Sequence, residues 1–328
     1  MKILKRIIYS FLIIIAICSV LLVTPRVWSA LNSDKPPVGY HFLLPGYLAV
    51  GIGLEKMIDM NPKVPADVEE FKDIEYKNIN GKSLQLDIYK PKNVTKPLPL
   101  LVFIHGGSWS HGKRSDYMVY LMPFVKKGYM TATVSYRLLQ DGTYPACIDD
   151  ITDAVQWFYK NGDKYGYNPD RIALIGGSAG AHLALLAAYG WKNPMQSSDT
   201  TNARVAPHRI KAVVDIYGPI DFTTEYARNQ PLITRFIAHP YTERPELYME
   251  ASPIHYVTKN VPPTMILHGT SDDLVPISQS DRLKACLDSL GVPNVYYKVP
   301  FWPHAMDVVK RVNEFSQIKM NDFFVKYL

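Results

Sequence analysis

The sequence predicts an α/β fold in which helices cover both faces of a mostly parallel central sheet. From residue 71 onward, short runs rich in Val, Ile and Leu alternate with segments of helical periodicity, and the connections between them are short. The runs are apolar along their whole length, as expected of strands that are buried on both faces. We therefore expect one main domain across residues 71–328 of the 328-residue chain, with a small cap-like insertion at residues 220–260.

The expected sheet begins with a hairpin, because the runs at residues 74–79 and 84–89 flank Asn80 and Gly81, a strong two-residue turn signal. Residues 220–260 are rich in Tyr and Pro and contain no clear strand, so we expect them above the strand ends, where an insertion shapes a pocket. The other strands are expected at residues 98–105, 130–136, 172–175, 210–217, 265–268 and 295–299, and the helices at residues 148–159, 181–189, 278–290 and 306–327.

Residues 1–30 are expected to be a signal peptide or a signal-anchor transmembrane segment. Three cations, Lys2, Lys5 and Arg6, precede an uncharged apolar stretch at residues 7–23 whose length is at the lower edge of the membrane-spanning range. The residues before Ala30 form a passable cleavage site, so both alternatives stay open, with the retained anchor favoured. Either way the rest of the chain is expected outside the cytoplasm, membrane-anchored or secreted.

Residues 31–70 form an apolar stretch interrupted by Gly and Pro, which we expect to be an N-terminal arm or linker packed on the main domain. The alternative is a helix that lies on the membrane surface or covers the functional site. The Pro-containing residues 62–67 mark the expected boundary before the main domain.

Composition excludes two classes of protein. The net charge of +6 is basic, but half of it comes from the three cations before the apolar stretch, and no long Lys/Arg run follows. This pattern predicts no nucleic-acid partner. Beyond the apolar stretch only Cys147 and Cys286 remain, so the domain does not depend on a disulfide framework.

Ser178 lies at the centre of Gly-Gly-Ser-Ala-Gly, residues 176–180. The apolar run at residues 172–175 precedes it and the helix expected at residues 181–189 follows, so Ser178 falls at a strand-to-helix turn. Such a turn holds the serine in a strained conformation with its hydroxyl exposed, and the glycines let neighbouring backbone approach closely. This context, more than the five-residue pattern itself, predicts a nucleophilic serine.

An acyl-transfer nucleophile also needs hydrogen-bond donors for the oxyanion that develops in the transition state. The loop His105-Gly106-Gly107-Ser108 follows an expected strand, at the place where an oxyanion loop belongs. We expect the backbone amides of Gly106 and Gly107 to act together with the amide of Ala179, the residue after the nucleophile.

An acid and a histidine follow in the order that the α/β-hydrolase arrangement requires. Asp272 and Asp273 come just after the strand expected at residues 265–268, and His304 comes after the strand expected at residues 295–299, just before the last helix. His304 is expected to take the proton of the serine hydroxyl as general base and to return it to the leaving group. The carboxylate would fix the tautomer of the imidazole.

These segments together resemble the α/β-hydrolase superfamily, and within it the bacterial carboxylesterases of the hormone-sensitive-lipase-like and acetyl-xylan or feruloyl esterase-like branches. The resemblance extends over residues 71–328 and implies an α/β-hydrolase fold. It assigns the acid to Asp272, the first aspartate of its segment, rather than to Asp273. The chain has Ser108 where many relatives have a third glycine, and Ala181 where many have a second, but every expected amide donor remains.

The resemblance implies a serine esterase that cleaves short-acyl or aryl esters, with small-molecule esters as substrates and no cofactor. An amide hydrolase of the aryl-formamidase or peptidase type is the alternative, and a membrane-tethered binding protein without catalysis is the second. No metal site is expected, because His-x-x-x-His spacing is absent. Four aromatic residues flank the catalytic segments and are candidates for lining the substrate pocket: Trp109, Tyr217, Phe222 and Trp302.

Overall fold

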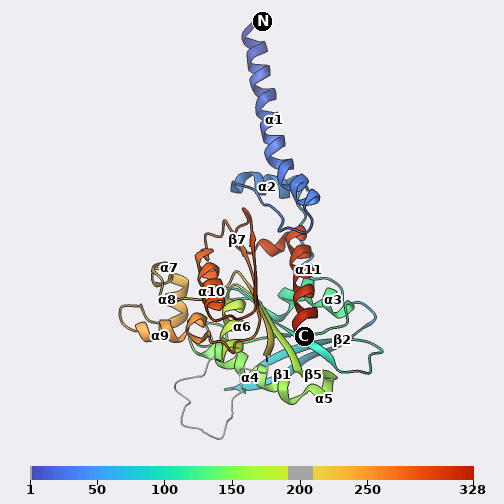
Figure 1. Cartoon of the computed structure of the whole chain (residues 1–328), viewed down its shortest axis with the longest axis vertical. Coiled ribbons are helices and arrows are strands. Elements are labelled where there is room, and N and C mark those ends of the chain that lie inside the picture. Colours follow the sequence, from blue (N-terminus) through green and yellow to red (C-terminus); the bar gives the residue numbers. More distant parts are fainter. Residues whose placement is uncertain (1, 191–209) are drawn as a thin grey trace.

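A central eight-stranded sheet runs through the computed structural model, which describes residues 2–190 and 210–328 (Figure 1). The strand order is β1-β2-β4-β3-β5-β6-β7-β8. β1 and β2 form an antiparallel hairpin, β2 is antiparallel to β4, and all other neighbours are parallel, which confirms the mostly parallel sheet. The strands are β1 (Val68–Ile79), β2 (Lys82–Pro91), β3 (Leu98–Ile104), β4 (Met130–Val134), β5 (Tyr167–Gly177), β6 (Ile210–Ile216), β7 (Thr264–Gly269) and β8 (Asn294–Val299).

Two hydrophobic cores lie on opposite faces of the sheet. Because successive residues of a strand point to opposite faces, Val102 of β3 packs in one core and Phe103 in the other. Both are fully buried, which explains why the strands are apolar without alternation. The first core is covered by α4 (Ala146–Lys160), α6 (Ala179–Tyr189) and α10 (Ser278–Ser289), and the second by α3 (Met118–Lys126) and α11 (Lys310–Tyr327).

The insertion expected at residues 220–260 folds as short helices beside α10 (Figure 1). Gln279 of α10 holds its start, because the Oε1 atom accepts hydrogen bonds from the amides of Ile220 (2.9 Å) and Asp221 (2.8 Å). The helices are α7 (Glu225–Arg228), α8 (Pro231–Ile237), α9 (Pro245–Glu250) and the 3-10 helix η4 (Pro253–Tyr256).

Three elements differ from the sequence-based expectations. Helix α3 was not predicted, because it contains Pro123 and is apolar almost all round, which removes the one-sided pattern of an amphipathic helix. The expected last helix is divided at Val309, whose extended backbone separates η5 (Met306–Val308) from α11. β1 begins at Val68, before the expected domain start at residue 71.

The remaining short elements are η1 (Arg114–Tyr117) and α5 (Gly162–Tyr165).

The N-terminal helix α1 (Lys2–Leu31) projects away from the body, and α2 (Leu43–Gly51) lies crosswise at its foot (Figure 1). The segment Ile3–Leu31 is long and apolar enough to cross a membrane, and its most apolar window is not buried by the rest of the chain. Length and composition alone do not separate a membrane anchor from a signal sequence.

The arm after α1 is bound to the loops before α11. The amide of Gly39 donates to the carbonyl of Pro300 (2.7 Å), and the amide of Ile58 donates to the carbonyl of Val308 (2.9 Å). Met57 and Val309 form an isolated antiparallel bridge. The arm therefore packs directly on the segment that carries His304.

Candidate active site

Ser178 stands at the sharp turn between β5 and α6. Its backbone has φ 54° and ψ −123°, a strained conformation for a residue with a side chain, and its amide donates to the carbonyl of Ile216 (2.9 Å). The turn needs glycine on both sides: a Cβ on Gly180 would lie 2.1 Å from the carbonyl oxygen of Ile104, and one on Gly176 would lie 2.2 Å from the carbonyl carbon of Gly180. These close approaches place the half-buried Ser178 at the end of β5, where it lines a cavity.

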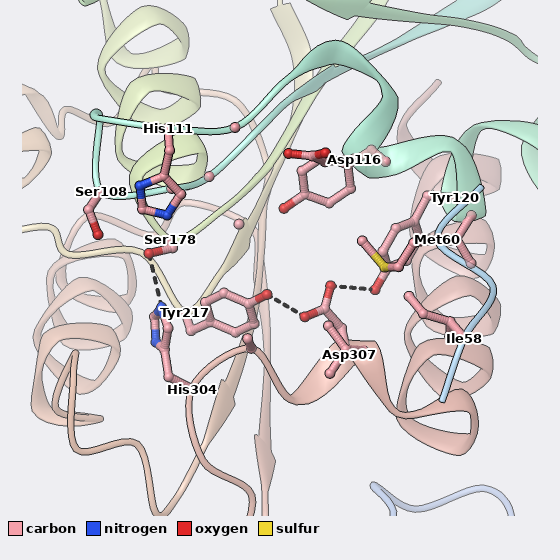
Figure 2. Close-up of a pocket in the computed structure, with 18 of the residues that line it drawn as sticks. Ile58, Met60, Ser108, His111, Asp116, Tyr120, Ser178, Tyr217, His304 and Asp307 are labelled. Carbon is pink, nitrogen blue, oxygen red and sulfur yellow. Dashed lines mark hydrogen bonds between the residues drawn. The ribbon is translucent and has the colours of Figure 1, made fainter. Parts of the chain in front are cut away.

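The three residues expected to act together are connected by hydrogen bonds. The Nε2 atom of His304 lies 2.9 Å from the Oγ atom of Ser178 (Figure 2), and its Nδ1 atom lies 2.7 Å from the Oδ2 atom of Asp272. The second oxygen of Asp272 accepts the amides of Leu274 (3.0 Å) and Val275 (2.8 Å). Asp273 points to the exposed side of the same turn.

The charge on Asp272 is stabilised despite its burial. Burial raises the pKa of this carboxyl group, but hydrogen bonds from His268 and His304 outweigh that effect and lower the pKa to about 2. The Nε2 atom of His268 lies 3.2 Å from the Oδ2 atom of Asp272, a contact that the sequence did not reveal. An ionised carboxylate facing Nδ1 keeps the proton there and leaves Nε2 free to accept one from Ser178.

The loop after β3 lies against the turn at residues 176–180 that carries Ser178, which we call the elbow. A Cβ on Gly106 would lie 2.7 Å from the carbonyl oxygen of Gly177, so only glycine permits this approach. Gly107, Ser108 and Trp109 all have left-handed backbone, with φ values of 110°, 50° and 56°, which coils the loop tightly. Ala179 is the first residue of α6, where helix amides have no acceptor within the helix.

Three cavities surround Ser178 and His304. The first, of about 320 Å³, is lined by Gly106, Gly107, Ser178, Tyr217 and His304, among others (Figure 2). The second is only about 20 Å³ and lies between Ser178, Trp109 and residues of α8. The third, of about 360 Å³, lies between the arm and the other side of the His304 loop.

The four aromatic candidates do not share one pocket. Tyr217 lines the first cavity, with its ring centroid 4.7 Å from that of His304, and Trp109 lines the second. Trp302 lines the third cavity. Phe222 lines none of these three cavities; it is fully buried, with its ring stacked on that of His182 at a centroid distance of 4.8 Å.

Asp307 was not predicted to have a role near the site. It is buried beside the first cavity, where it accepts hydrogen bonds from the hydroxyl groups of Tyr217 and Tyr120, the latter at 3.1 Å (Figure 2). Burial raises the pKa of Asp307, and the two hydroxyl groups oppose that effect. Its position three residues after His304 was the only signal in the sequence. Asp307 connects the His304 loop to β6 and α3.

Asp215 is a further buried carboxyl group near the site. Its Oδ1 atom accepts the amide of Gly218 (2.7 Å), and among the described residues its Oδ2 atom has no partner. Burial raises the pKa of Asp215 from 3.8 to about 7, and the hydrogen bond from the Gly218 amide and the neighbouring His268 oppose that effect only in part.

We expect Asp215 to make the folded state less stable as pH rises. A carboxyl group whose folded pKa is raised stabilises the fold below its ordinary pKa and loses that contribution between about pH 4 and pH 7. Because one pKa unit corresponds to about 1.4 kcal/mol, the loss is at most about 4 kcal/mol. Asp215→Asn should therefore be more stable than wild type at pH 8 but equal to it at pH 4, as measured by urea unfolding in detergent. Exposed Asp163→Asn is the control, and parallel pH profiles for wild type and Asp215→Asn would contradict the expectation.

No cluster of three or more His, Cys, Asp or Glu side chains suited to a metal ion occurs within residues 2–190 and 210–328. The Ser178 site itself consists of side chains and amides suited to acyl transfer.

Comparisons with known proteins identify the family. Residues 86–287 match the BD-FAE family. Two curated relatives from Mycobacterium tuberculosis (strain ATCC 25618 / H37Rv) are each 33% identical: esterase LipC, over 68% of this chain and 57% of its own length, and esterase LipQ, over 71% and 56%. The chain thus spans little more than half the length of these relatives.

Solved structures share the fold. A bifunctional GH43-CE protein of Bacteroides eggerthii matches with a TM-score of 0.67 and 26% identity, over 78% of this chain and 38% of that one. A propionate-bound esterase, Est2, of the planctomycete Thermogutta terrifontis matches with a TM-score of 0.67 and 21% identity, over 81% and 96%. Since the family match covers more than half of the sequence, the chain belongs to the BD-FAE family, within the α/β-hydrolase carboxylesterases of the hormone-sensitive-lipase-like branch.

Proposed function

We propose that the chain hydrolyses carboxylic esters through an acyl-enzyme on Ser178. The observation that carries the proposal is the hydrogen-bonded series from Ser178 through His304 to Asp272 at the edge of an open cavity. His304 takes the hydroxyl proton at Nε2 while the Ser178 oxygen attacks the ester carbonyl. The same nitrogen then gives the proton to the leaving alcohol, and water releases the acid by the reverse sequence.

The amides of Gly106, Gly107 and Ala179 are proposed to stabilise the oxyanion. They belong to the loop and the helix start that meet at the elbow, where backbone donors remain available. The left-handed residues after Gly106 hold these donors in place before the substrate arrives, so no reorganisation is required at the moment of reaction. The two curated relatives, LipC and LipQ, are named esterases, and no observation favours an amide substrate.

The cavities on the two sides of Ser178 support a small acyl group. The leaving alcohol must receive its proton from Nε2 of His304, so it departs on the His304 side, into the first cavity. The acyl group then points toward the second cavity, which His304 does not line. A volume of about 20 Å³ holds roughly one small group. We infer that acetyl and similar short esters are preferred.

Hydrolysis of p-nitrophenyl esters from acetate to octanoate tests this function. We expect kcat/KM to fall at least about tenfold from acetate to octanoate, because a long acyl chain has no room beside Trp109. Leu232→Ala should enlarge the second cavity and reduce the difference, whereas the exposed Leu290→Ala should not. A fluorophosphonate should label the peptide that contains Ser178. Absence of hydrolysis with every ester and absence of label would refute the function.

We propose further that α1 is retained as a membrane anchor. Its end is part of the folded body: Arg311 donates from Nη1 to the hydroxyl of Ser29 (2.8 Å), and the same hydroxyl accepts the amide of Val38 (3.0 Å). Arg311 also donates from Nε to both carboxylate oxygens of Glu55, at 2.9 and 3.0 Å, and Glu55 is only 3% exposed. Cleavage after Ala30 would remove Ser29 and leave two donors without their acceptor.

Intact mass and cell fractionation test the anchor. The chain, expressed with its own N-terminus in a bacterial host, should remain with carbonate-washed membranes and contain residues 2–30. A mature chain that begins at Leu31 and is found in the soluble exported fraction would contradict retention.

A further inference from the structure

The outer face of α2 is apolar and uncharged. The nine residues of α2 include no charged side chain, and Leu44 and Leu48 are 67% and 48% exposed. Tyr47, which also lines the third cavity, is 71% exposed. Ile52, just after the helix, is 67% exposed. In water such a face is costly, but an interfacial helix buries it among lipid headgroups and the upper acyl chains.

The position of α2 places this face at the membrane that α1 enters. α2 lies crosswise at the foot of α1, between α1 and the catalytic body (Figure 1). Trp28, near the end of α1, and Tyr47 are both exposed, and such aromatic residues concentrate at the boundary between lipid and water. The contacts of Arg311 with Ser29 and Glu55 fix the end of α1 to the body, so α2 cannot turn away from the membrane independently.

The third cavity lies directly beneath α2. Tyr40, Phe42 and Val50 line it from the arm, and Phe301 and Trp302 line it from the body. Its volume of about 360 Å³ is in the range of small-ligand pockets, and its walls are mainly apolar and aromatic. Trp302 is held in place because its indole nitrogen donates to the carbonyl of Pro37 (2.9 Å).

The first and third cavities meet at the same catalytic loop. His304, Ala305 and Val308 line both of them. The first cavity is on the side to which the leaving alcohol departs, and the His304 loop forms a wall that it shares with the third cavity. The acyl side, in contrast, ends in the cavity of about 20 Å³.

We propose that the substrate is a short-acyl ester of a long apolar alcohol that resides in the membrane, with the alcohol portion occupying the cavity beneath α2. This inference rests on the proposed esterase function and adds the substrate class to it. The outer face of α2 lies in the lipid surface, and its inner face forms the wall of the cavity. The substrate then reaches Ser178 from the lipid without crossing open water.

A pair of isomeric esters tests the proposal directly. Hexadecyl acetate carries its long chain on the alcohol side, and ethyl palmitate carries a chain of similar length on the acyl side. The full chain, reconstituted in vesicles of ether-linked phosphatidylcholine that contain one ester, should release acetate at least about tenfold faster than palmitate. Equal rates, or a preference for ethyl palmitate, would overturn the proposal.

Soluble p-nitrophenyl acetate separates this proposal from the esterase function. Hydrolysis of p-nitrophenyl acetate that depends on Ser178, without hydrolysis of hexadecyl acetate, would overturn the membrane-resident substrate and leave the esterase function intact. No Ser178-dependent hydrolysis of any ester would overturn both.

Two pairs of variants assign the effect to α2. Leu44→Asp with Leu48→Asp should lower the rate on vesicle-embedded hexadecyl acetate at least about tenfold and preserve the rate on p-nitrophenyl acetate. Ile318→Asp with Val325→Asp, at exposed apolar positions of α11, is the matched control and should change neither rate. Equal rates for the α2 variant and its control would overturn the proposal.

Gly46→Phe introduces a large side chain at the wall of the third cavity. A Cβ at Gly46, which lines the third cavity, would make ordinary contact with Tyr40 at 3.6 Å, so the added ring extends into the free volume. A Cβ at Gly51 meets nothing within 4 Å, which makes Gly51→Phe the control. Only Gly46→Phe should lose hydrolysis of hexadecyl acetate while retaining that of p-nitrophenyl acetate. If the aspartate variant of α2 misfolds and loses both activities, Gly46→Phe and Gly51→Phe still test the proposal. Full activity of Gly46→Phe on hexadecyl acetate would overturn it.

Discussion

Replacing Ser178 with Ala is expected to lower kcat for p-nitrophenyl acetate by a factor on the order of 10⁴ to 10⁶, because the acyl-enzyme can no longer form. The amides at the elbow remain, so a small rate above that of water should persist. Ala retains the Cβ and adds no new backbone strain at φ 54°, so the melting temperature should stay near that of wild type. Steady-state kinetics and fluorophosphonate labelling measure the loss.

Ser178→Gly and Ser289→Ala are the controls for this experiment. Glycine adopts positive φ without strain, so Ser178→Gly should lose the same activity while gaining about 1 kcal/mol or more in the free energy of unfolding. Ser289 is exposed on α10, and its replacement should change neither rate nor labelling. Ser178→Ala with the wild-type rate would assign the nucleophile to another residue.

Replacing Asp272 with Asn should lower kcat/KM by about 10⁴, because the neutral amide no longer selects the tautomer of His304 that accepts a proton at Nε2. With its pKa near 2, Asp272 is ionised throughout the range from pH 5 to pH 8, so the factor should be constant across that range. Rates with p-nitrophenyl acetate at several pH values measure it.

Asp273→Asn is the matched control, since it makes the same chemical change at the neighbouring, exposed position. It should retain the wild-type rate within about twofold. A large loss for Asp273→Asn together with a small one for Asp272→Asn would exchange the roles of the two residues.

The order of apolar runs, glycine turns and the residues Ser, Asp and His along the chain was sufficient to predict the fold. It also predicted which residues meet at the elbow. Strands buried on both faces are continuous apolar runs, and the turn after such a run at residues 172–175 needs glycines, so Ser178 was recognisable from local pattern. The carboxyl ends of neighbouring parallel strands lie at one edge of a sheet, which brings Asp272 after β7 and His304 after β8 together.

Features that depend on packing between distant segments were not predictable in the same way. Phe222 and Tyr217 are both aromatic residues near the catalytic segments, yet Tyr217 lines the first cavity whereas Phe222 packs on His182. Asp307 gave no signal in the sequence beyond its nearness to His304, because its partner Tyr120 is far away along the chain. The third cavity lies between the arm and the loops after β8; the sequence predicted that the arm packs on the main domain, but no local pattern specifies where it docks.

The contact between Ser29 and Arg311 also has a consequence for biosynthesis. The two residues are 282 positions apart, so the end of α1 is made well before its partner in α11. Until α11 and the loops before it have been made, the arm lacks the residues with which it forms its hydrogen bonds. The His304 loop, which packs on this arm, therefore takes its final position only after α11 has been made and has folded back onto the N-terminal segment.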